Sequence, residues 1–588
     1  MPRYVREVST RDFTARRSVP GEPLGKVVWQ CYSFSRKEVT ECYTFAVGGD
    51  MVHRWLKARG LLGIVIAGSL VVSALALVPG VASSAPLPAP LRHLPAGPLP
   101  TVKPIPAGSG IHGYPYDAVP VKPSFPGAPT ISLAHYGYAE REFTMSGTTN
   151  VYQQSGLWGS NGVWNVSVAQ SNVPYTTRLL VRYPTNPAKF NGTVVVEWLN
   201  DTTGGDQDPV WSEIYHEVLS QGYAYVGVSA QTGSMVEDKT WDPVRYAALG
   251  DSNDGQSYDI FTQAAEAARA DTANLLGGLK PATVIGAGDS QSAFRLVTYV
   301  NAIQPLSHAF NGFLAIGRSA LAAPIGSGLV MFSPFPALIR TDNTTPLIQI
   351  ETEGDVEELA AAYSRQTDNA DLRTWELAGA AHIDLHEGQY EAGTILRENP
   401  QLTAPQCVFG VMANGATQPD NMGVFELEDS ALVALRKWII QGVPPPSGNP
   451  IATTPFFNVV ERDQYGNALG GIRLPDIQVP TETYSAINFS QPSQQSLSLS
   501  QIMTTLENIF TTLETGVITD PTLRDEGLCL LEGYYTPLGQ ATLQSLYPTH
   551  ADYVSQYTAA AQADLAAGFL TRYDYNQAVK AAQAAPIP

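Results

Sequence analysis

The spacing of hydrophobic and polar residues changes about a third of the way along the chain. From residue 104 to 180, apolar and polar positions alternate in stretches such as EFTMSGTTNVYQ and GVWNVSVAQ, among many Gly, Pro, Tyr and Thr residues. Alternation of this kind, punctuated by turn formers, is typical of short antiparallel strands. We therefore expect N-terminal β additions in front of the main fold.

Seven short, nearly continuous apolar runs follow, beginning near residue 178. They are RLLVRYP, TVVVEWLN, YAYVGVSA, ATVIGAG, FNGFLAIG, PLIQIETEG and LRTWELAG. Most of them alternate with segments of helical periodicity, such as PVWSEIYHEVLSQG and DIFTQAAEAARADTANLLGGL. Buried strands that alternate with helices predict an α/β fold, with a mostly parallel central sheet and helices on both faces.

The chain after the last of these runs divides into three parts. One more amphipathic helix is expected from Ser430 to Gly442, where a glycine and a proline run end it. The main domain, 111–445, closes there. Residues 446–490 are punctuated by Gly and Pro, and we expect them to form a β and loop extension. Residues 500–588 are rich in Ala, Gln and Leu, a composition that favours a C-terminal helical segment.

Residues 51–85 have the order of parts found in a secretory signal peptide. Met51 opens a segment with three basic residues, an uncharged apolar run occupies 61–78, and small residues follow it. We expect cleavage after Ala82 or Ala85. The alternative is a membrane anchor retained at 61–78, because its 18 residues reach the lower limit for spanning a bilayer.

The segments on either side of the signal peptide carry less information. Residues 1–50 fit no targeting pattern and form a doubtful leader, so we expect translation to start at Met51. Residues 86–110 form a Pro-rich linker. Because residues 51–85 resemble a signal peptide, we expect the mature protein to be secreted or to reside in the cell envelope.

Composition narrows the classes of protein to consider. With 44% hydrophobic and 15% charged residues, most of the 588-residue chain should fold. The net charge of −19 argues against a nucleic acid partner, because binding phosphates requires clustered Lys and Arg. In an oxidising compartment Cys407 and Cys529 are a candidate disulfide.

No metal or other cofactor is expected from the spacing of possible ligands. Neither Cys407 nor Cys529 has a second Cys or His at ligand distance along the chain. Asp206 and Asp208 are spaced as in a calcium loop, but the remaining ligands of an EF-hand are missing.

The pentapeptide GDSQS, 288–292, lies between an apolar run and a segment of helical character. A sharp turn between a strand and a helix lifts one side chain above the sheet edge, and the amides of the helix point to the same place. Ser290 is therefore the candidate nucleophile. The sequence GDSND at 250–254 begins in the same way, but no strand precedes it.

A serine nucleophile in this setting requires a carboxylate and then a histidine later in the chain. ETEGDVEEL follows the run PLIQI, and within it Asp355 fits best, with Glu353 as an open alternative. His382 directly follows small residues after LRTWELAG, and we prefer it to His386, which lies further into DLHEGQYEAG.

Backbone amides are the expected donors to a developing oxyanion. One is the amide of Gln291, at the start of the helix. The other is expected near Asn200 or Asp201, in the loop that follows TVVVEWLN.

Taken together, these stretches resemble a bacterial family of α/β hydrolase domains. The matching segments include TTRLLVRYP, VVEWLN with GGDQDPVW, GYAYVGVSAQ, WDPVRYAALG, GAGDSQS, TEGDV, RTWELAGAAH and GNALGGIRLPDIQVP. The resemblance covers about residues 110–588 and implies the α/β-hydrolase fold with the same nucleophile, acid and base. The sequence departs from the usual motif at Ser292, where Gly is common, and Gly354 leaves the choice of acid open.

The expected function is hydrolysis of a carboxylic ester by an exported serine enzyme, through an acyl group on Ser290. A cap is expected at about 318–344, and its apolar residues favour a small-molecule or lipid-like ester, although they serve equally well for packing. Membrane contact is expected only through an uncleaved signal segment. The alternatives are an acyltransferase or peptidase with the same triad, and a secreted or envelope binding protein on an inactive hydrolase scaffold.

Overall fold

The computed structural model describes ten segments of the chain: 28–33, 40–45, 99–115, 131–202, 205–251, 253–326, 334–398, 418–455, 458–488 and 529–587. The expected signal peptide and Cys407 lie outside them, so the predictions made there stay predictions. The chain divides into two compact units, Met1–Val81 and Ala82–Pro588. In the first unit, β1 (Val28–Ser33) and β2 (Thr40–Phe45) form an antiparallel pair.

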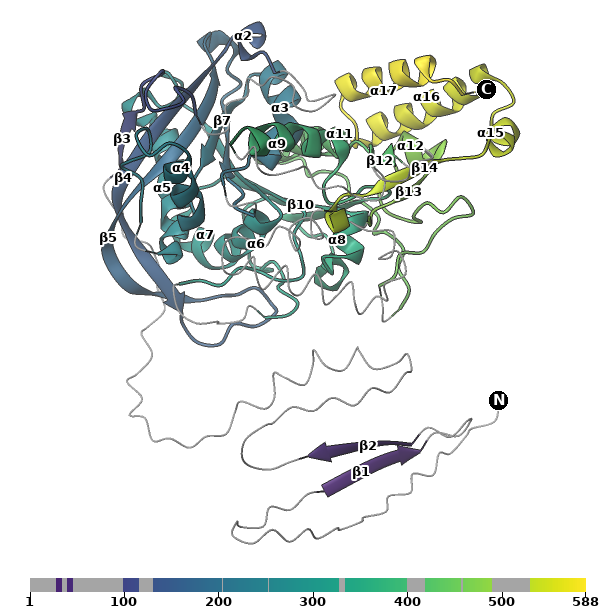
Figure 1. Cartoon of the computed structure of the whole chain (residues 1–588), viewed down its shortest axis with the longest axis horizontal. Coiled ribbons are helices and arrows are strands. Elements are labelled where there is room, and N and C mark those ends of the chain that lie inside the picture. Colours follow the sequence, from purple (N-terminus) through teal and green to yellow (C-terminus); the bar gives the residue numbers. More distant parts are fainter. Residues whose placement is uncertain are drawn as a thin grey trace. The chain divides into compact units, whose positions relative to one another are not determined.

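The second unit is built on a nine-stranded sheet (Figure 1). In spatial order its strands are β11 (Leu372–Leu377), β10 (Leu347–Thr352), β9 (Gly312–Ile316), β8 (Thr283–Asp289), β6 (Thr193–Trp198), β7 (Ala224–Val228), β5 (Val166–Pro184), β4 (Tyr138–Gln154) and β3 (Thr101–Pro104). The six strands from β11 to β7 run parallel, and the last three pair in antiparallel fashion. All seven predicted runs lie in this sheet, so the expected α/β fold is confirmed.

The N-terminal β addition consists of long strands rather than the short ones expected. β4 has 17 residues and β5 has 19, and they pair along almost their whole length, with an irregularity between Thr149 and Tyr152. Pro174 lies inside β5. Only 179–182 of β5 pair with β7, so Pro174 has no second neighbouring strand that would need its missing N–H.

Two hydrophobic clusters cover the opposite faces of the sheet. Along β6, Val194 and Val196 belong to one cluster and Val195 belongs to the other. One face is covered by α5 (Ser257–Ala270), and the other by α3 (Pro209–Gln221) and α11 (Val424–Gln441). Burial on both faces explains why the parallel strands read as continuous apolar runs.

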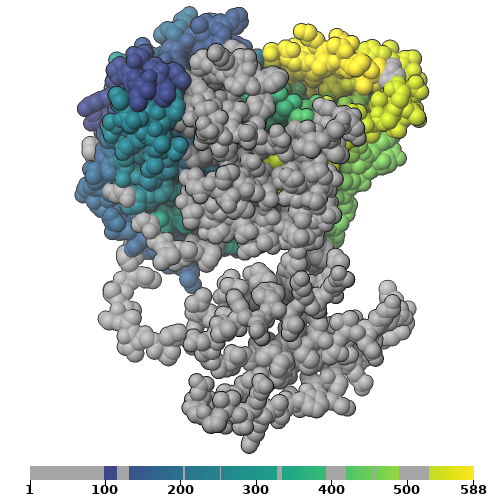
Figure 2. All heavy atoms as spheres, viewed as in Figure 1, coloured from purple at the N-terminus to yellow at the C-terminus, as the bar shows by residue number. Residues whose placement is uncertain are grey.

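The described part of the C-terminal segment, 529–587, is mostly helical, as predicted, and it also contains one strand. Its helices are α15 (Gln540–Leu546), α16 (His550–Ala567) and α17 (Arg572–Ala584), and the last two form an exposed surface at one side of this unit (Figure 2). A three-stranded sheet of β12 (Gln418–Pro419), β14 (Tyr534–Pro537) and β13 (Glu482–Ser485) connects this segment to the 446–490 extension. In the parts of the chain that the structure describes, no helix has the length and apolar character needed to span a bilayer.

Candidate active site

Ser290 occupies a strained turn at the end of β8. It has φ 53° and ψ −121°, a positive φ that a residue with a side chain rarely adopts, at a cost of about 1–3 kcal/mol. Its amide donates to Ile316 O (3.0 Å) at the end of β9, and α6 (Gln291–Thr298) begins immediately after it. The turn thus fixes the serine hydroxyl at the carboxyl edge of the parallel strands.

Ser292 fits the position where glycine is more usual. A Cβ at Gly288 would lie 3.2 Å from the backbone carbon of Ser292, so the turn leaves room only for small residues. The Ser292 hydroxyl donates to Leu199 O (3.2 Å), just beyond the end of β6. The departure from the motif therefore adds a hydrogen bond between the serine turn and the neighbouring strand.

The structure brings Ser290, His382 and Asp355 together. His382 Nε2 lies 2.9 Å from Ser290 Oγ, and His382 Nδ1 lies 2.5 Å from Asp355 Oδ1. An ionised carboxylate only accepts hydrogen bonds, so the proton is on Nδ1, which donates to Asp355. This tautomer leaves Nε2 as an acceptor for the hydroxyl of Ser290.

Asp355 is held in place by the start of α8 (Glu353–Glu357). The Thr352 amide donates to Asp355 Oδ2 (2.6 Å), and the Asp355 amide donates to Thr352 Oγ1 (3.1 Å), which forms a capping box. A Cβ at Gly354 would lie 2.9 Å from the amide nitrogen of His382. Glycine at this position thus allows the turn that carries the acid to approach the loop that carries the histidine.

The two alternative residues have other partners. Glu353 accepts the Gly379 amide (2.8 Å) and forms an ion pair with Arg462 (2.7 Å). His386 Nε2 lies 3.0 Å from Ser212 O, and its ring stacks on Tyr215. Of the two candidate carboxylates, only Asp355 is hydrogen-bonded to His382.

The expected oxyanion donors differ in whether their amides already have a hydrogen-bond partner. Gln291 is the first residue of α6, where an amide has no partner within the helix. The Asn200 amide instead donates to Gln207 O (2.9 Å), so the expectation for Asn200 is corrected. Asp201 is adjacent, and its amide forms no hydrogen bond with the described residues. The side chain of Asn200 donates a hydrogen bond to Asp289 O (3.2 Å), next to the serine turn.

Asp289, the residue before the serine, contributes to the electrostatic environment of the imidazole together with Asp355. Burial raises the pKa of Asp289 to about 7, an effect that His382 opposes and the charge of Asp355 reinforces. Burial acts to lower the pKa of His382, but the charge of Asp355, the hydrogen bond to it and the charge of Asp289 together raise that pKa above its usual value. The two acidic residues therefore make this imidazole easier to protonate than an ordinary histidine.

Further buried carboxyls surround Asp289. Burial raises the pKa of Glu213 and of Glu387 well above the usual value, and the charge of Asp289 adds to the rise in each case. Burial thus disfavours the charged form of both carboxyls.

Sequence reasoning missed the residues that support the histidine loop. Asp420 accepts the Ala381 amide (2.7 Å), and Leu531 O accepts the Ile383 amide (2.9 Å). Leu531 lies about 150 positions beyond the histidine, and no local pattern signals such a contact. Asp289 had a signal, since it is a charged residue at the end of an apolar strand.

Other sequence expectations concern residues around the site. Asp206 and Asp208 are partners of buried arginines, and the described part of the chain holds no group of three or more His, Cys, Asp or Glu side chains suited to a metal ion. Cys529 is disulfide-bonded. Its pairing with Cys407 stays a prediction, because Cys407 lies outside the described residues.

The expected cap, 318–344, is described except for 327–333. Phe335, one of the apolar residues of the expected cap, is 58% exposed, and its ring lies 5.6 Å from that of Tyr363. This aromatic pair therefore lies at the surface rather than in the core.

Comparisons with known proteins identify the family. A family model described as alpha/beta hydrolase domain matches residues 101–580. No curated protein matches the chain. The structure of XC6422 from Xanthomonas campestris, described as an α/β serine hydrolase without a lid, is 14% identical over 42% of this chain and 90% of that chain, with a TM-score of 0.24. A fungal esterase from Rhizomucor miehei is 13% identical over 43% of this chain and 82% of that chain, with a TM-score of 0.23. At such TM-scores these likenesses carry no argument about function.

Proposed function

The chain belongs to the alpha/beta hydrolase domain family, and from this membership we propose that it is an exported serine hydrolase that cleaves a carboxylic ester. The observation that supports this most strongly is the continuous hydrogen-bonded series from Ser290 through His382 to Asp355. A strained positive φ at Ser290 supports it further, because a purely structural turn has little reason to carry such strain.

In the proposed first half-reaction, Ser290 Oγ attacks the ester carbonyl carbon while His382 Nε2 takes the hydroxyl proton. Asp355 keeps the imidazole in the required tautomer and stabilises its cation. The amides of Gln291 and Asp201 donate to the oxyanion of the tetrahedral intermediate. The intermediate collapses when the imidazolium gives its proton to the departing alcohol, and the acyl group stays on Ser290.

The second half-reaction reverses these roles with water. His382 Nε2 takes a proton from a water molecule, whose oxygen attacks the acyl carbon. Collapse of the second tetrahedral intermediate breaks the bond to Ser290 Oγ, which recovers its proton from the imidazolium. The raised pKa of His382 suits both steps, because the protonated form must persist long enough to donate.

Export is the part of the proposal that rests on the N-terminal sequence. The signal-like residues 51–85 support it, and so does the disulfide at Cys529, because structural disulfides persist in oxidising compartments. An ester substrate outside the cytoplasm would then reach the enzyme without crossing a membrane.

Hydrolysis of p-nitrophenyl esters of graded acyl length tests the ester assignment. We expect the purified protein to hydrolyse at least one member of the series, and the Ser290→Ala variant to hydrolyse none above background. A folded wild-type protein that cleaves no ester in the series would contradict the assignment and favour the inactive scaffold.

The pH dependence of the reaction should respond to Asp289. Only neutral His382 can accept the serine proton, so the rate falls as the pH drops through the pKa of this histidine. Because the charge of Asp289 raises that pKa, Asp289→Asn should move the acidic limb of the kcat/KM profile to lower pH. Asp371 precedes β11, whereas His382 follows that strand. The control variant Asp371→Asn should therefore leave the acidic limb in place. An unchanged or higher limb in Asp289→Asn would refute this electrostatic role.

A further inference from the structure

The connection between β6 and α3 reaches the serine turn from one side. Here it is called the oxyanion loop, and the structure describes it at residues 199–202 and 205–208. Asn200 Nδ2 donates to Asp289 O (3.2 Å), and Leu199 O accepts the Ser292 hydroxyl (3.2 Å). The first residues of the loop are thus hydrogen-bonded on both sides of Ser290.

Backbone pairing closes the oxyanion loop on itself. The amides and carbonyls of Asn200 and Gln207 exchange two hydrogen bonds, each of 2.9 Å. Whatever fixes the far end of the loop at Asp206 and Asp208 therefore also fixes its near end, where the Asp201 amide lies.

Two buried arginines of β5 hold that far end. Arg178 Nη1 donates to Asp206 Oδ2 (2.8 Å), and Arg182 Nη1 donates to Asp208 Oδ2 (2.7 Å). The arginines are four residues apart on a strand, so their side chains leave the same face of the sheet. Ser229, beyond the end of β7, donates to Asp206 as well. The oxyanion loop is therefore attached to the sheet by charge-assisted hydrogen bonds at two positions, Asp206 and Asp208.

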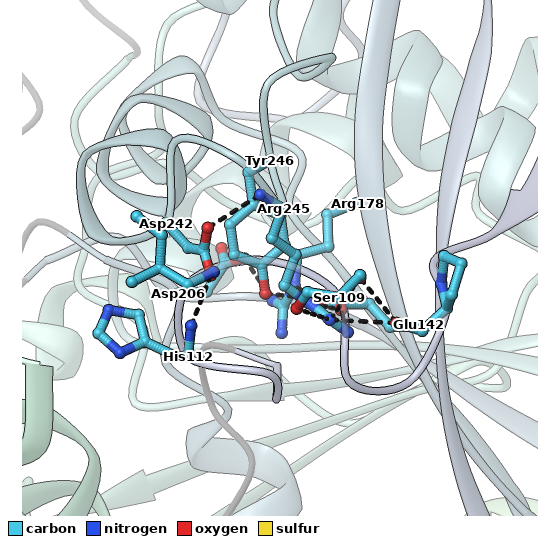
Figure 3. A network of polar contacts seen from close by, with 10 residues as sticks. Ser109, His112, Glu142, Arg178, Asp206, Asp242, Arg245 and Tyr246 are labelled. Carbon is cyan, nitrogen blue, oxygen red and sulfur yellow. Dashed lines mark hydrogen bonds and ion pairs between the residues drawn. The ribbon is translucent and has the colours of Figure 1, made fainter.

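The arginines are themselves held by further carboxylate and aromatic side chains. Glu142 of β4 accepts from Arg178, from Arg245 Nε (2.8 Å) and from the Tyr246 hydroxyl (2.7 Å), and these side chains converge in one network with Asp206 (Figure 3). Arg182 donates to Glu140, and its guanidinium lies 4.1 Å from the centre of the Trp211 ring. The side chains of Arg178 and Glu142 have no more than 1% of their surface exposed.

We infer that Arg178 and Arg182 are positioning residues for the oxyanion hole, which hold the Asp201 amide in place through Asp206 and Asp208. This inference rests on the proposed function. Buried ion pairs are seldom more stabilising than apolar packing, but they impose a defined geometry. A donor to a developing oxyanion must be fixed before the reaction, because reorganisation during the reaction would lose its benefit.

Asp206 variants of the full chain test the inference. Losing one oxyanion donor costs about 10²- to 10³-fold in kcat. We expect Asp206→Ala to lower kcat for a p-nitrophenyl ester by about 10²-fold with KM little changed, because the donor acts in the transition state. Asp206→Asn, which still offers an acceptor to Arg178 and Ser229, should recover part of the loss.

The matched control is Glu376→Gln. Glu376 is another buried carboxylate that accepts from an arginine, Arg365 Nη2 (2.6 Å), but it lies on β11 and does not contact the oxyanion loop. This variant should lower the melting temperature and leave kcat unchanged. A wild-type kcat in folded Asp206→Ala, a loss expressed only in KM, or an equal loss of kcat in Glu376→Gln would overturn the inference.

Two further measurements distinguish a positioning role from a loss of folding and from failure of the proposed function. If Asp206→Ala does not fold, Asp206→Asn and Ser229→Ala decide instead: lower kcat at constant KM supports the positioning role, and unchanged kcat in both refutes it. Failure of the proposed function would look different, because the wild-type protein itself would then lack esterase activity and a serine that reacts with a fluorophosphonate.

Discussion

Replacement of Ser290 by alanine is expected to lower kcat for ester hydrolysis by about 10⁴- to 10⁶-fold, because no other group can form the acyl-enzyme. The variant should remain folded, since alanine keeps the Cβ and the backbone hydrogen bond to Ile316 does not involve the side chain. Steady-state kinetics on a p-nitrophenyl ester, with circular dichroism to check the fold, measures both quantities.

The control for this substitution is Ser252→Ala. Ser252 lies in GDSND, which shares the first three residues of the motif but follows no strand. It should keep the wild-type rate. Equal activity of Ser290→Ala and the wild-type protein, or loss of activity in Ser252→Ala alone, would show that the nucleophile has been misassigned.

Asp355→Asn should be the second most damaging substitution, with kcat reduced by about 10⁴-fold. Asparagine can donate to His382 Nδ1, and this stabilises the tautomer with its proton on Nε2, which cannot accept the serine proton. Because the Thr352 amide can still donate to the side-chain oxygen, the capping box should survive. Kinetics with thermal unfolding as a check on stability separates the catalytic effect from a structural one.

Glu353→Gln is the comparison that decides between the two candidate acids. Glutamine can still accept the Gly379 amide, but it loses the ion pair with Arg462, so we expect lower stability and most of the wild-type kcat. If Glu353→Gln lost activity to the extent expected for Asp355→Asn, while Asp355→Asn remained active, the assignment of the acid would be reversed.

The parallel strands could be predicted from the sequence because a strand buried on both faces is a nearly continuous run of apolar residues. The same apolar runs indicated Ser290 as the nucleophile, since a strand precedes GDSQS and a helix follows it. His382 and Asp355 followed from the order of strands, because loops after neighbouring parallel strands meet at one edge of a sheet. Chain order could not decide between Asp355 and Glu353. Which of the two carboxylates faces His382 depends on how a single turn of helix is rotated.

Features that depend on contacts across the fold could not be predicted in this way. The hydrogen bond from the Asn200 amide to Gln207 O depends on the conformation of the loop between β6 and α3. Arg178 and Arg182 lie four residues apart on the same face of a strand, a spacing that equally fits solvent-exposed charges. Leu531 supports the histidine loop from a segment far along the chain. In each case the partner is set by packing rather than by local spacing.

The most direct test of the account is the site of covalent reaction with a fluorophosphonate. The account predicts about one adduct per folded chain, located by peptide mass spectrometry on Ser290 and absent from Ser290→Ala. An adduct on another residue of the esterase-active protein, or no adduct on folded wild-type protein, would contradict the claim that Ser290 is the nucleophile of a serine hydrolase.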